Sequence, residues 1–314
     1  MTGTWTVVAD ETGIRLDKFL AAPGRLGSRS RAVDALEKGK IFLNEEEVGV
    51  ADGARRLALG DAVRLWMDRP GSSRRVSQRA PRAGELPILF EDDSLVVINK
   101  PPGLLTVPLP RREEAASVES MLVEHFRSKS TRRPYVVHRI DRDTSGLVVF
   151  ATNARAQLTL KGQFRRHEAT RIYLAVVYGV PSPTRGVWRD HLVWDHGDLI
   201  QKATHARDPR GSEAVSEYEV VEAFEGASVI QVQLVTGKRN QIRLQARLRG
   251  HTLVGEQRYV FGPETLRPLE FSRQALHAWR LGFVHPKSGK SMRFEAPLPE
   301  DIDELVGRFR SGRG

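Results

Sequence analysis

Residues 137–150 of the chain read Val137-His-Arg-Ile-Asp-Arg-Asp-Thr-Ser-Gly-Leu-Val-Val-Phe150. The first half of this stretch is polar and charged, and the second half is an apolar run typical of a buried strand. It predicts a loop that carries two aspartates, two arginines and a histidine directly before that strand. Catalytic groups commonly lie on loops held by such rigid elements. The alternative is that Asp143, Thr144 and Ser145 only satisfy the hydrogen bonds of a turn.

Short β-rich segments surround this stretch on both sides. We predict a helix at 116–126 and strands at 88–90, 95–99, 146–151, 171–179, 216–223, 228–235, 241–246 and 280–284. Strands dominate, helices are short, and regular βαβ alternation is missing. This pattern favours an α+β fold over a doubly wound parallel sheet.

Composition divides the 314 residues into three parts. In residues 1–68 we predict a strand at 5–8, helices at 17–22 and 31–38, and strands at 40–44 and 63–66. Residues 69–85 hold five arginines, two prolines and two glycines, with little to bury, which predicts a basic flexible linker. This linker either only spaces the flanking parts or also touches phosphate. Residues 86–314 form the larger domain.

Charge and residue usage limit the classes of function. Lys and Arg outnumber Asp and Glu by 49 to 39, and a net charge of +10 indicates a polyanionic partner, nucleic acid first; the alternative is a charged, solvated surface. The chain has no cysteine, which excludes disulfides, thiolate nucleophiles and cysteine-ligated metal sites. Its N-terminus lacks the pattern of a secretory signal, and no apolar stretch approaches the roughly 20 residues of a bilayer span. We therefore expect a cytoplasmic protein with no membrane partner.

Several blocks of the larger domain resemble, in order, the motifs of one enzyme family. Residues 138–146 resemble the HRLD-x-x-TSG signature of the RluA-type pseudouridine synthases. Further blocks similar to motifs of this family lie at 97–105, 171–179, 236–244, 275–278, 283–286 and 295–299. The resemblance spans roughly residues 87–300. It implies the pseudouridine synthase fold, with a mixed, mainly antiparallel sheet.

The N-terminal part is similar to the small RNA-binding module first named in ribosomal protein S-four. The similarity rests on residues 14–20, 28–31, 39–44 and 60–61. It implies a phosphate-binding surface that includes the basic residues Arg15, Lys18, Arg29, Arg31, Lys38 and Lys40. The alternative is a scattered set of solvated charges.

The resemblance also assigns roles to four residues of the larger domain. Asp141 matches the catalytic aspartate, which serves as a nucleophile or as a base. Arg243 matches the arginine that pairs with it, and a nearby arginine favours the ionised carboxylate. Tyr173 matches the aromatic residue that lies against the uracil; the alternative is a strand residue that packs in the core. Arg139 matches the residue that holds the RNA after the target base flips out.

Four positions depart from the pattern of the family. Asn240 stands in place of the usual histidine, Lys238 of arginine, Gln245 of a second histidine, and Glu256 of aspartate. For His138, a hydrogen-bonding structural role is favoured over a role as general base. The nine histidines show no ligand spacing, and the nearest pair, His191 and His196, lies in a loop-like stretch, so no metal site is expected.

The sequence as a whole therefore predicts an isomerase, an RNA pseudouridine synthase that acts on structured RNA. Its reaction needs no redox change and no external group, so no cofactor is expected. Large-subunit ribosomal RNA is the favoured partner, and transfer RNA is the alternative. A second alternative is a non-catalytic ribosome-assembly factor on the same fold. We expect a monomer, because the chain shows no heptads or large apolar stripe.

Overall fold

The computed structural model describes residues 2–37, 40–44, 46–66, 86–108, 116–127, 132–198, 200–260 and 269–312. The chain forms two compact units, Met1–Ala80 and Pro81–Gly314. The predicted linker at 69–85 lies outside the described residues.

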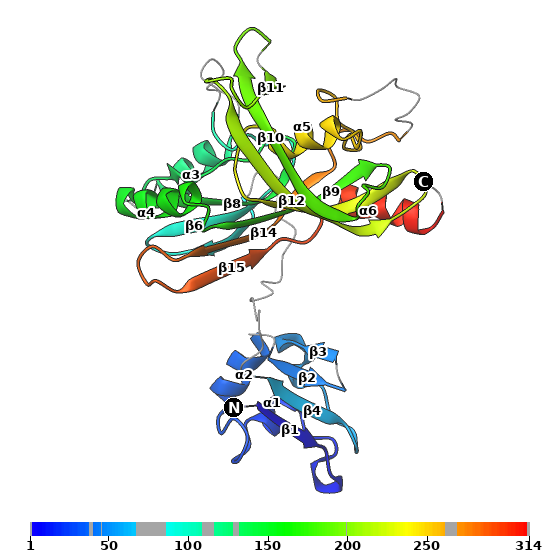
Figure 1. The fold of residues 1–314 in the computed structure, drawn as a ribbon. Helices are drawn as coiled ribbons and strands as arrows, with labels where there is room; N and C mark the ends of the chain where they lie inside the picture. The colour runs from blue at the N-terminus through cyan, green and yellow to red at the C-terminus, as the bar shows by residue number, and fades with distance from the viewer. Residues whose placement is uncertain are drawn as a thin grey trace. The chain divides into compact units, whose positions relative to one another are not determined.

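A single twisted sheet organises the larger unit (Figure 1). Along the sheet, the strands follow the order β11 (Ile200–Thr204), β10 (Arg185–Asp195), β12 (Ser212–Ala223), β13 (Ala227–Leu234), β9 (Thr170–Tyr178), β14 (Leu276–Val284), β8 (Ser145–Ala151), β6 (Leu95–Lys100) and β5 (Ile88–Glu91). Two further strands extend it: β15 (Ser291–Glu295) pairs with β14, and β7 (Tyr135–Val136) with β8. Among the described strands of this sheet, only β8 and β14 pair in parallel. The predicted α+β class and the mixed, mainly antiparallel sheet are therefore confirmed.

Among the described residues, four helices cover this sheet on both faces. Near β6 and β8, α3 (Val118–Phe126) packs on one face and α4 (Ala154–Arg165) on the other. Near β9 and β13, α5 (Gln241–Leu248) packs on one face of the sheet and α6 (Glu300–Arg310) on the other. All seven residues of β8 are buried, because a strand covered on both faces has no solvent side.

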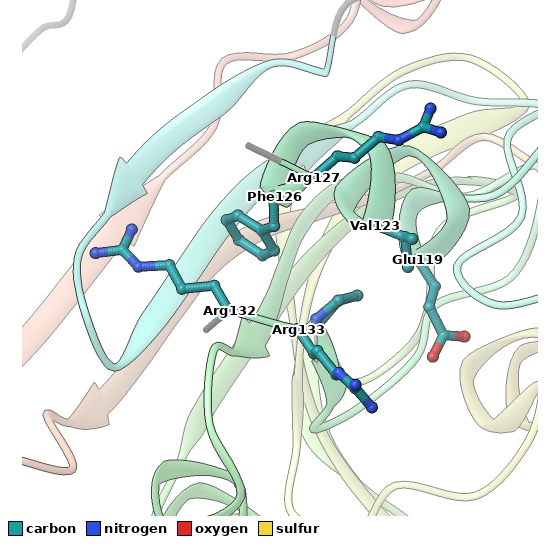
Figure 2. A pocket seen from close by; sticks show the side chains of 7 residues that line it. Glu119, Val123, Phe126, Arg127, Arg132 and Arg133 are labelled. Carbon is teal, nitrogen blue, oxygen red and sulfur yellow. The ribbon is translucent and has the colours of Figure 1, made fainter. Parts of the chain in front are cut away.

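Polar caps fix where α3 and α4 begin. Ser117 accepts the backbone N–H of Ser120, and Asn153 accepts that of Ala156. Beside α3 lies a cavity of about 450 Å³ (Figure 2), lined by Glu119, Val123, Phe126, Arg127, Arg132, Arg133 and Pro134. Burial raises the pKa of Glu119 at this cavity.

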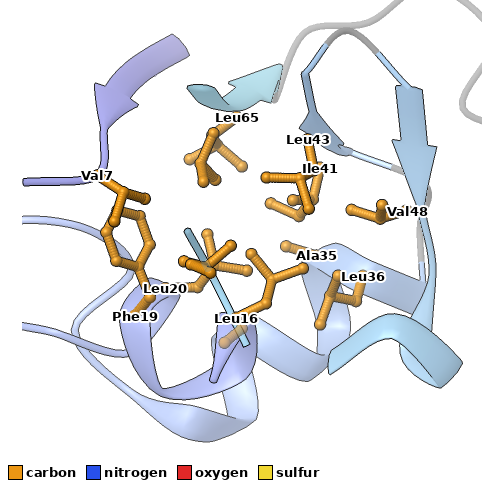
Figure 3. Close-up of a cluster of buried hydrophobic side chains, with 13 residues drawn as sticks. Val7, Leu16, Phe19, Leu20, Ala35, Leu36, Ile41, Leu43, Val48 and Leu65 are labelled. Carbon is orange, nitrogen blue, oxygen red and sulfur yellow. The ribbon is translucent and has the colours of Figure 1, made fainter. Parts of the chain in front are cut away.

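The N-terminal unit is a four-stranded sheet packed against two short helices. Its strand order is β1 (Thr2–Thr6), β4 (Ala62–Trp66), β2 (Ile41–Leu43) and β3 (Glu46–Val48). The helices α1 (Leu16–Leu20) and α2 (Arg29–Glu37) direct apolar side chains onto it (Figure 3), and two 3₁₀ turns lie at Ala9–Glu11 and Val50–Ala54. Such a small unit forms a correspondingly small core.

The prediction of a strand at 241–246 is wrong. This segment is helix α5, and Gln241 and Gln245 are both buried with Ile242, Leu244 and Ala246. The two glutamines lie one turn apart and hydrogen-bond to β12 and its neighbours. Ile242, Leu244 and Ala246 lie at every second position, which is the apolar pattern of a strand. The helical pattern is seen only when the buried glutamines are counted with them.

Other elements differ in position or were not predicted. The first strand covers 2–6 and not 5–8, because Val7 leaves the ladder and its N–H bonds to Asp61 O. His191 lies in β10 and not in a loop. The elements missed from the sequence are β3, β7, β10, β11, β15, α4 and α6.

Candidate active site

The loop at 137–144 is placed by the parallel pairing of β8 with β14. Gly146, at the start of β8, has φ 107°, and a Cβ there would lie 2.3 Å from Ala278 O. Only glycine permits so close an approach in this conformation. The register pairs Gly146 with Ala278 and Ser145 with His277, so the loop ends at an interior strand, which lies between β14 and β6.

Backbone carbonyls of this loop are held by buried side chains that the sequence reasoning did not single out. The ammonium of Lys100 donates to the carbonyls of Pro101, Leu104 and Arg142, each at 2.8 Å. Burial lowers the pKa of Lys100 to about 7. Thr106 Oγ1 donates to Ile140 O at 2.7 Å, and Arg273 Nη1 to Asp143 O at 2.9 Å. The backbone on both sides of Asp141 is thereby fixed.

Asp141 contacts Arg243, which projects from α5. Arg243 Nη1 donates to Asp141 Oδ2 at 2.9 Å. The other edge of the guanidinium binds Glu256, with Nε 2.6 Å from Oε2 and Nη2 2.7 Å from Oε1. The exposed side-chain fraction rises from 0% for Glu256 to 12% for Arg243 and 29% for Asp141. The carboxylate of Asp141 is therefore the solvent-facing end of a buried ionic chain.

Glu256 compensates the buried charge of Arg243. Burial raises the pKa of Glu256, but the hydrogen bonds and charge of Arg243 outweigh it, so this pKa lies below its ordinary value. For Arg243, burial lowers the pKa, but the hydrogen bonds and charges of Glu256 and Asp141 raise it above its ordinary value. Glu256 Oε1 also accepts the N–H groups of Arg258 and Tyr259. The guanidinium is thus held charged and fixed.

Tyr173 packs beside this pair. In one buried cluster its ring joins Ile140 and Ile242, the neighbours in sequence of Asp141 and Arg243. Burial raises the pKa of Tyr173 to about 12, Arg171 opposes the rise, and the negative charge of Asp141 adds to it. Within the described ranges, its hydroxyl has no hydrogen-bond partner. The structure therefore brings Asp141, Tyr173 and Arg243 together.

Comparison with known proteins gives this arrangement a family. The family model described as RNA pseudouridylate synthase matches residues 94–248. An uncharacterized RNA pseudouridine synthase of Bacillus subtilis is 34% identical over 309 residues, covering 97% of each chain. The chain belongs to the RNA pseudouridine synthase family. It is an isomerase that converts uridine to pseudouridine in RNA, and the prediction of the family and of the enzyme class is confirmed.

Other relatives of the synthase carry more specific names. The ribosomal large subunit pseudouridine synthase D of Zymomonas mobilis is 34% identical over 309 residues, covering 96% of this chain and 95% of the relative. Among solved structures, human RNA pseudouridylate synthase domain containing 4 has a TM-score of 0.59 and 22% identity, over 71% of this chain and 92% of that one. This likeness confirms the pseudouridine synthase fold.

Two polar residues of the synthase motifs have structural contacts. His138 accepts the N–H of Val149 on Nε2 at 3.2 Å and stacks on Phe164 at 4.6 Å. Burial lowers the pKa of His138 to about 3, so this ring is neutral. Gln245 donates to Trp188 O and Ala214 O and accepts from Ser216 Oγ, which fixes α5 to β10 and β12.

Arg139 lies in the larger unit, and the other predicted RNA-contacting residues lie in the N-terminal unit. Arg139 is exposed, two residues before Asp141, with no ion pair to any residue that the structure describes. In the N-terminal unit, Arg15 and Arg29 both contact Asp17, at 2.8 and 3.4 Å. Arg31 is exposed, Lys40 is half-buried, and Lys38 lies outside the described residues.

The cavity beside α3 is separate from the site of the synthase. The residues that line the cavity include neither Asp141, Tyr173 nor Arg243 (Figure 2). In the part of the chain that the structure describes, no three His, Asp or Glu side chains are grouped to hold a metal ion. No described helix is both long and apolar enough to span a bilayer.

Proposed function

We propose that this synthase isomerises uridines of large-subunit ribosomal RNA, with Asp141 as its catalytic residue. The observation that carries the proposal is the partly exposed Asp141 carboxylate, held 2.9 Å from the largely buried Arg243. Several relatives, from Zymomonas, Neisseria and Vibrio, are named ribosomal large subunit pseudouridine synthase D. These names favour the ribosomal target over transfer RNA.

The reaction requires a group that acts while the base is detached. The bond between C1′ and N1 breaks, the uracil turns, a bond forms between C1′ and C5, and the C5 proton leaves while N1 gains one. An ionised carboxylate serves either as nucleophile or as base in this sequence. The guanidinium of Arg243 favours the ionised form of Asp141 and fixes its direction. No atom or electron beyond those of the substrate is needed, so the proposal includes no cofactor.

Tyr173 and Arg139 are proposed to contact the flipped nucleotide and the strand that it leaves. With a pKa of about 12, Tyr173 keeps its proton at neutral pH. It is therefore proposed to lie against the uracil as a hydrogen-bond donor. The C5 proton, which leaves after the bond between C1′ and C5 has formed, needs a group that is already ionised to take it. Flipping a base costs a few kcal/mol, and the exposed Arg139 is placed to hold the rearranged strand.

The N-terminal unit is proposed to bind RNA. Its size, its exposed Arg31 and its similarity to the S-four module support this role. The basic segment 69–85 would tether it to the synthase domain. Binding to a polyanion predicts affinity that falls steeply with salt.

Pseudouridine mapping of total RNA tests the proposal. Cells carry the native protein, Asp141→Ala, or the control Asp143→Ala, whose side chain pairs only with Arg142 among the described residues. We expect one or more large-subunit positions to be lost with Asp141→Ala alone, while RNA affinity stays within about threefold.

Three other results would redirect the proposal. A position lost only in transfer RNA would assign the alternative substrate. Full modification by Asp141→Ala would remove Asp141 from the catalytic role. Loss with both aspartate variants would indicate a damaged loop.

A further inference from the structure

Asn240 is a second polar neighbour of the Asp141 carboxylate, in addition to the Arg243 guanidinium. With its amide nitrogen toward the carboxylate, Asn240 Nδ2 is 3.0 Å from both Oδ1 and Oδ2, and its Oδ1 is 3.0 Å from Tyr259 Oη. A carboxylate only accepts hydrogen bonds, so the NH₂ group faces Asp141. The hydroxyl of Tyr259 accepts the backbone N–H of Gln201 at 3.0 Å, which leaves its own proton for Asn240 Oδ1. The hydrogen bonds therefore run in one direction, from Gln201 N–H to Tyr259 Oη, from Tyr259 to Asn240 Oδ1, and from Asn240 Nδ2 to Asp141.

We propose that Asn240 is a positioning residue that, with Tyr259 behind it, orients the carboxylate of Asp141 for the isomerisation. The proposal rests on the proposed catalytic role of Asp141. Arg243 supplies a charged hydrogen bond to Oδ2 alone, and the Asn240 amide lies within hydrogen-bond distance of both Oδ1 and Oδ2. Donors that together reach both oxygens fix the position and the rotation of a carboxylate, which a donor to one oxygen does not.

The backbone places Asn240 for this contact. It precedes α5 with φ 51°, a left-handed conformation that asparagine tolerates better than most residues. Both donors to Asp141 are held by one turn, because Glu256 binds Arg243 and Tyr259 binds Asn240. Within this turn, Glu256 Oε1 accepts the N–H of Tyr259 at 3.1 Å.

Single-turnover kinetics with saturating enzyme, together with RNA affinity, test the proposal. Asn240→Gly deletes the amide and keeps the backbone unstrained, since glycine readily adopts positive φ. We expect the rate constant to fall about 10- to 100-fold, the range for one hydrogen bond to a charged group. RNA affinity should stay within about threefold. Asn240→Asp keeps the size but places a second carboxylate against Asp141, and it should be slower still.

Tyr259→Phe separates positioning from a general structural role. It should lower the rate in the native background and have little further effect in Asn240→Gly, because both changes break the same chain. The matched control is Tyr218→Phe, which removes a buried hydroxyl bonded to Pro183 O at 2.8 Å and should leave the rate unchanged.

The inference and the proposed function fail in different ways. If Asp141→Asn is inactive while Asn240→Gly keeps a rate within about threefold of native, the inference is wrong and the role of Asp141 stands. It is also wrong if the effects of Asn240→Gly and Tyr259→Phe add fully, or if the loss appears in RNA affinity alone. If Asp141→Asn retains full activity, the proposed catalytic role fails, and the inference fails with it.

Discussion

Arg243 Nη1 lies 2.9 Å from Asp141 Oδ2, although the two residues are 102 positions apart in the chain. The guanidinium reaches Asp141 with one nitrogen because its other two are held by Glu256. In this series of ion pairs, Glu256 is fully buried, Arg243 joins the two carboxylates, and Asp141 is partly exposed.

Arg243→Lys keeps the positive charge and removes the planar guanidinium, whose nitrogens bind both Asp141 and Glu256. An ammonium cannot bind Glu256 through two nitrogens and still reach Asp141 in fixed geometry. We expect the rate of isomerisation to fall at least about 100-fold, with RNA affinity nearly unchanged. Single-turnover assays and filter binding measure the two effects. Arg247→Lys, at an exposed position of the same helix, is the control.

Glu256→Gln removes the fully buried counter-charge of Arg243 and leaves only the partly exposed Asp141 carboxylate beside it. Breaking a buried ion pair from one side costs about 3–5 kcal/mol. We expect the free energy of unfolding of the Pro81–Gly314 unit to fall by about this amount, measured by urea titration. Glu256→Asp keeps the charge and should cost less. Equal stability of all three proteins would contradict the anchoring role.

Tyr173→Phe tests the hydroxyl apart from the buried ring. The ring packs with Ile140 and Ile242, and phenylalanine preserves that packing. We expect the midpoint of urea unfolding to stay close to native and the isomerisation rate to fall by about tenfold or more, the cost of a lost hydrogen bond to the reacting base. An unchanged rate would limit Tyr173 to packing.

The lowered pKa of His138 predicts that the fold is less stable in acid. His138 has a pKa of about 3 in the fold, and its ordinary value is 6.5. Between these pH values the unfolded chain binds a proton that the folded chain does not, so the free energy of unfolding falls as pH falls below 6.5. For His138 the loss between pH 7.5 and pH 5 is about 2 kcal/mol.

Urea unfolding of His138→Gln at these two pH values checks this contribution. The variant should lose less stability on acidification than the native protein, whatever its stability at neutral pH. The control is His196→Gln, at an exposed position, which should lose as much stability between the two pH values as the native protein. An identical acid loss in His138→Gln and the native protein would show that this ring is protonated in the fold.

Arg31→Gln probes the N-terminal unit as an RNA-binding surface. Each phosphate contact that is lost reduces the slope of log affinity against log salt by about 0.7 to 0.9. We expect a reduction of this size with Arg31→Gln and none with Arg166→Gln, an exposed arginine of the larger unit paired with Glu168. An unchanged slope with Arg31→Gln would remove this residue from the RNA contact.

Much of the fold and the central part of the site could be predicted from the sequence. Apolar runs such as 95–99 and 146–151 are strands, and the motif residues Asp141, Tyr173 and Arg243 lie together. Long strands with half-exposed residues, such as β10, give a weak periodic signal and were missed. Helix α5 was mistaken because its buried face carries glutamines.

The supporting contacts of the site could not be predicted, because they join segments that are distant in sequence. The sequence around Lys100 does not indicate that its ammonium binds Arg142 O, 42 residues away. Asn240 and Glu256 stood out only as departures from a family pattern. Which atoms they face follows from the helix register of α5 and the turn after it, and neither is encoded in local periodicity.

The parallel pairing of β8 with β14 sets the order in which this enzyme is completed during its synthesis. Asp141 leaves the ribosome first, Arg243 follows 102 residues later, and the β14 residues that pair with Ser145 and Gly146 follow later still. Translation adds about 5–20 residues per second, so the nascent chain carries an unfinished site for several seconds. A chain that stops before residue 276 lacks the strand that supports the loop. Modification of RNA therefore requires that the chain has been synthesised at least through β14.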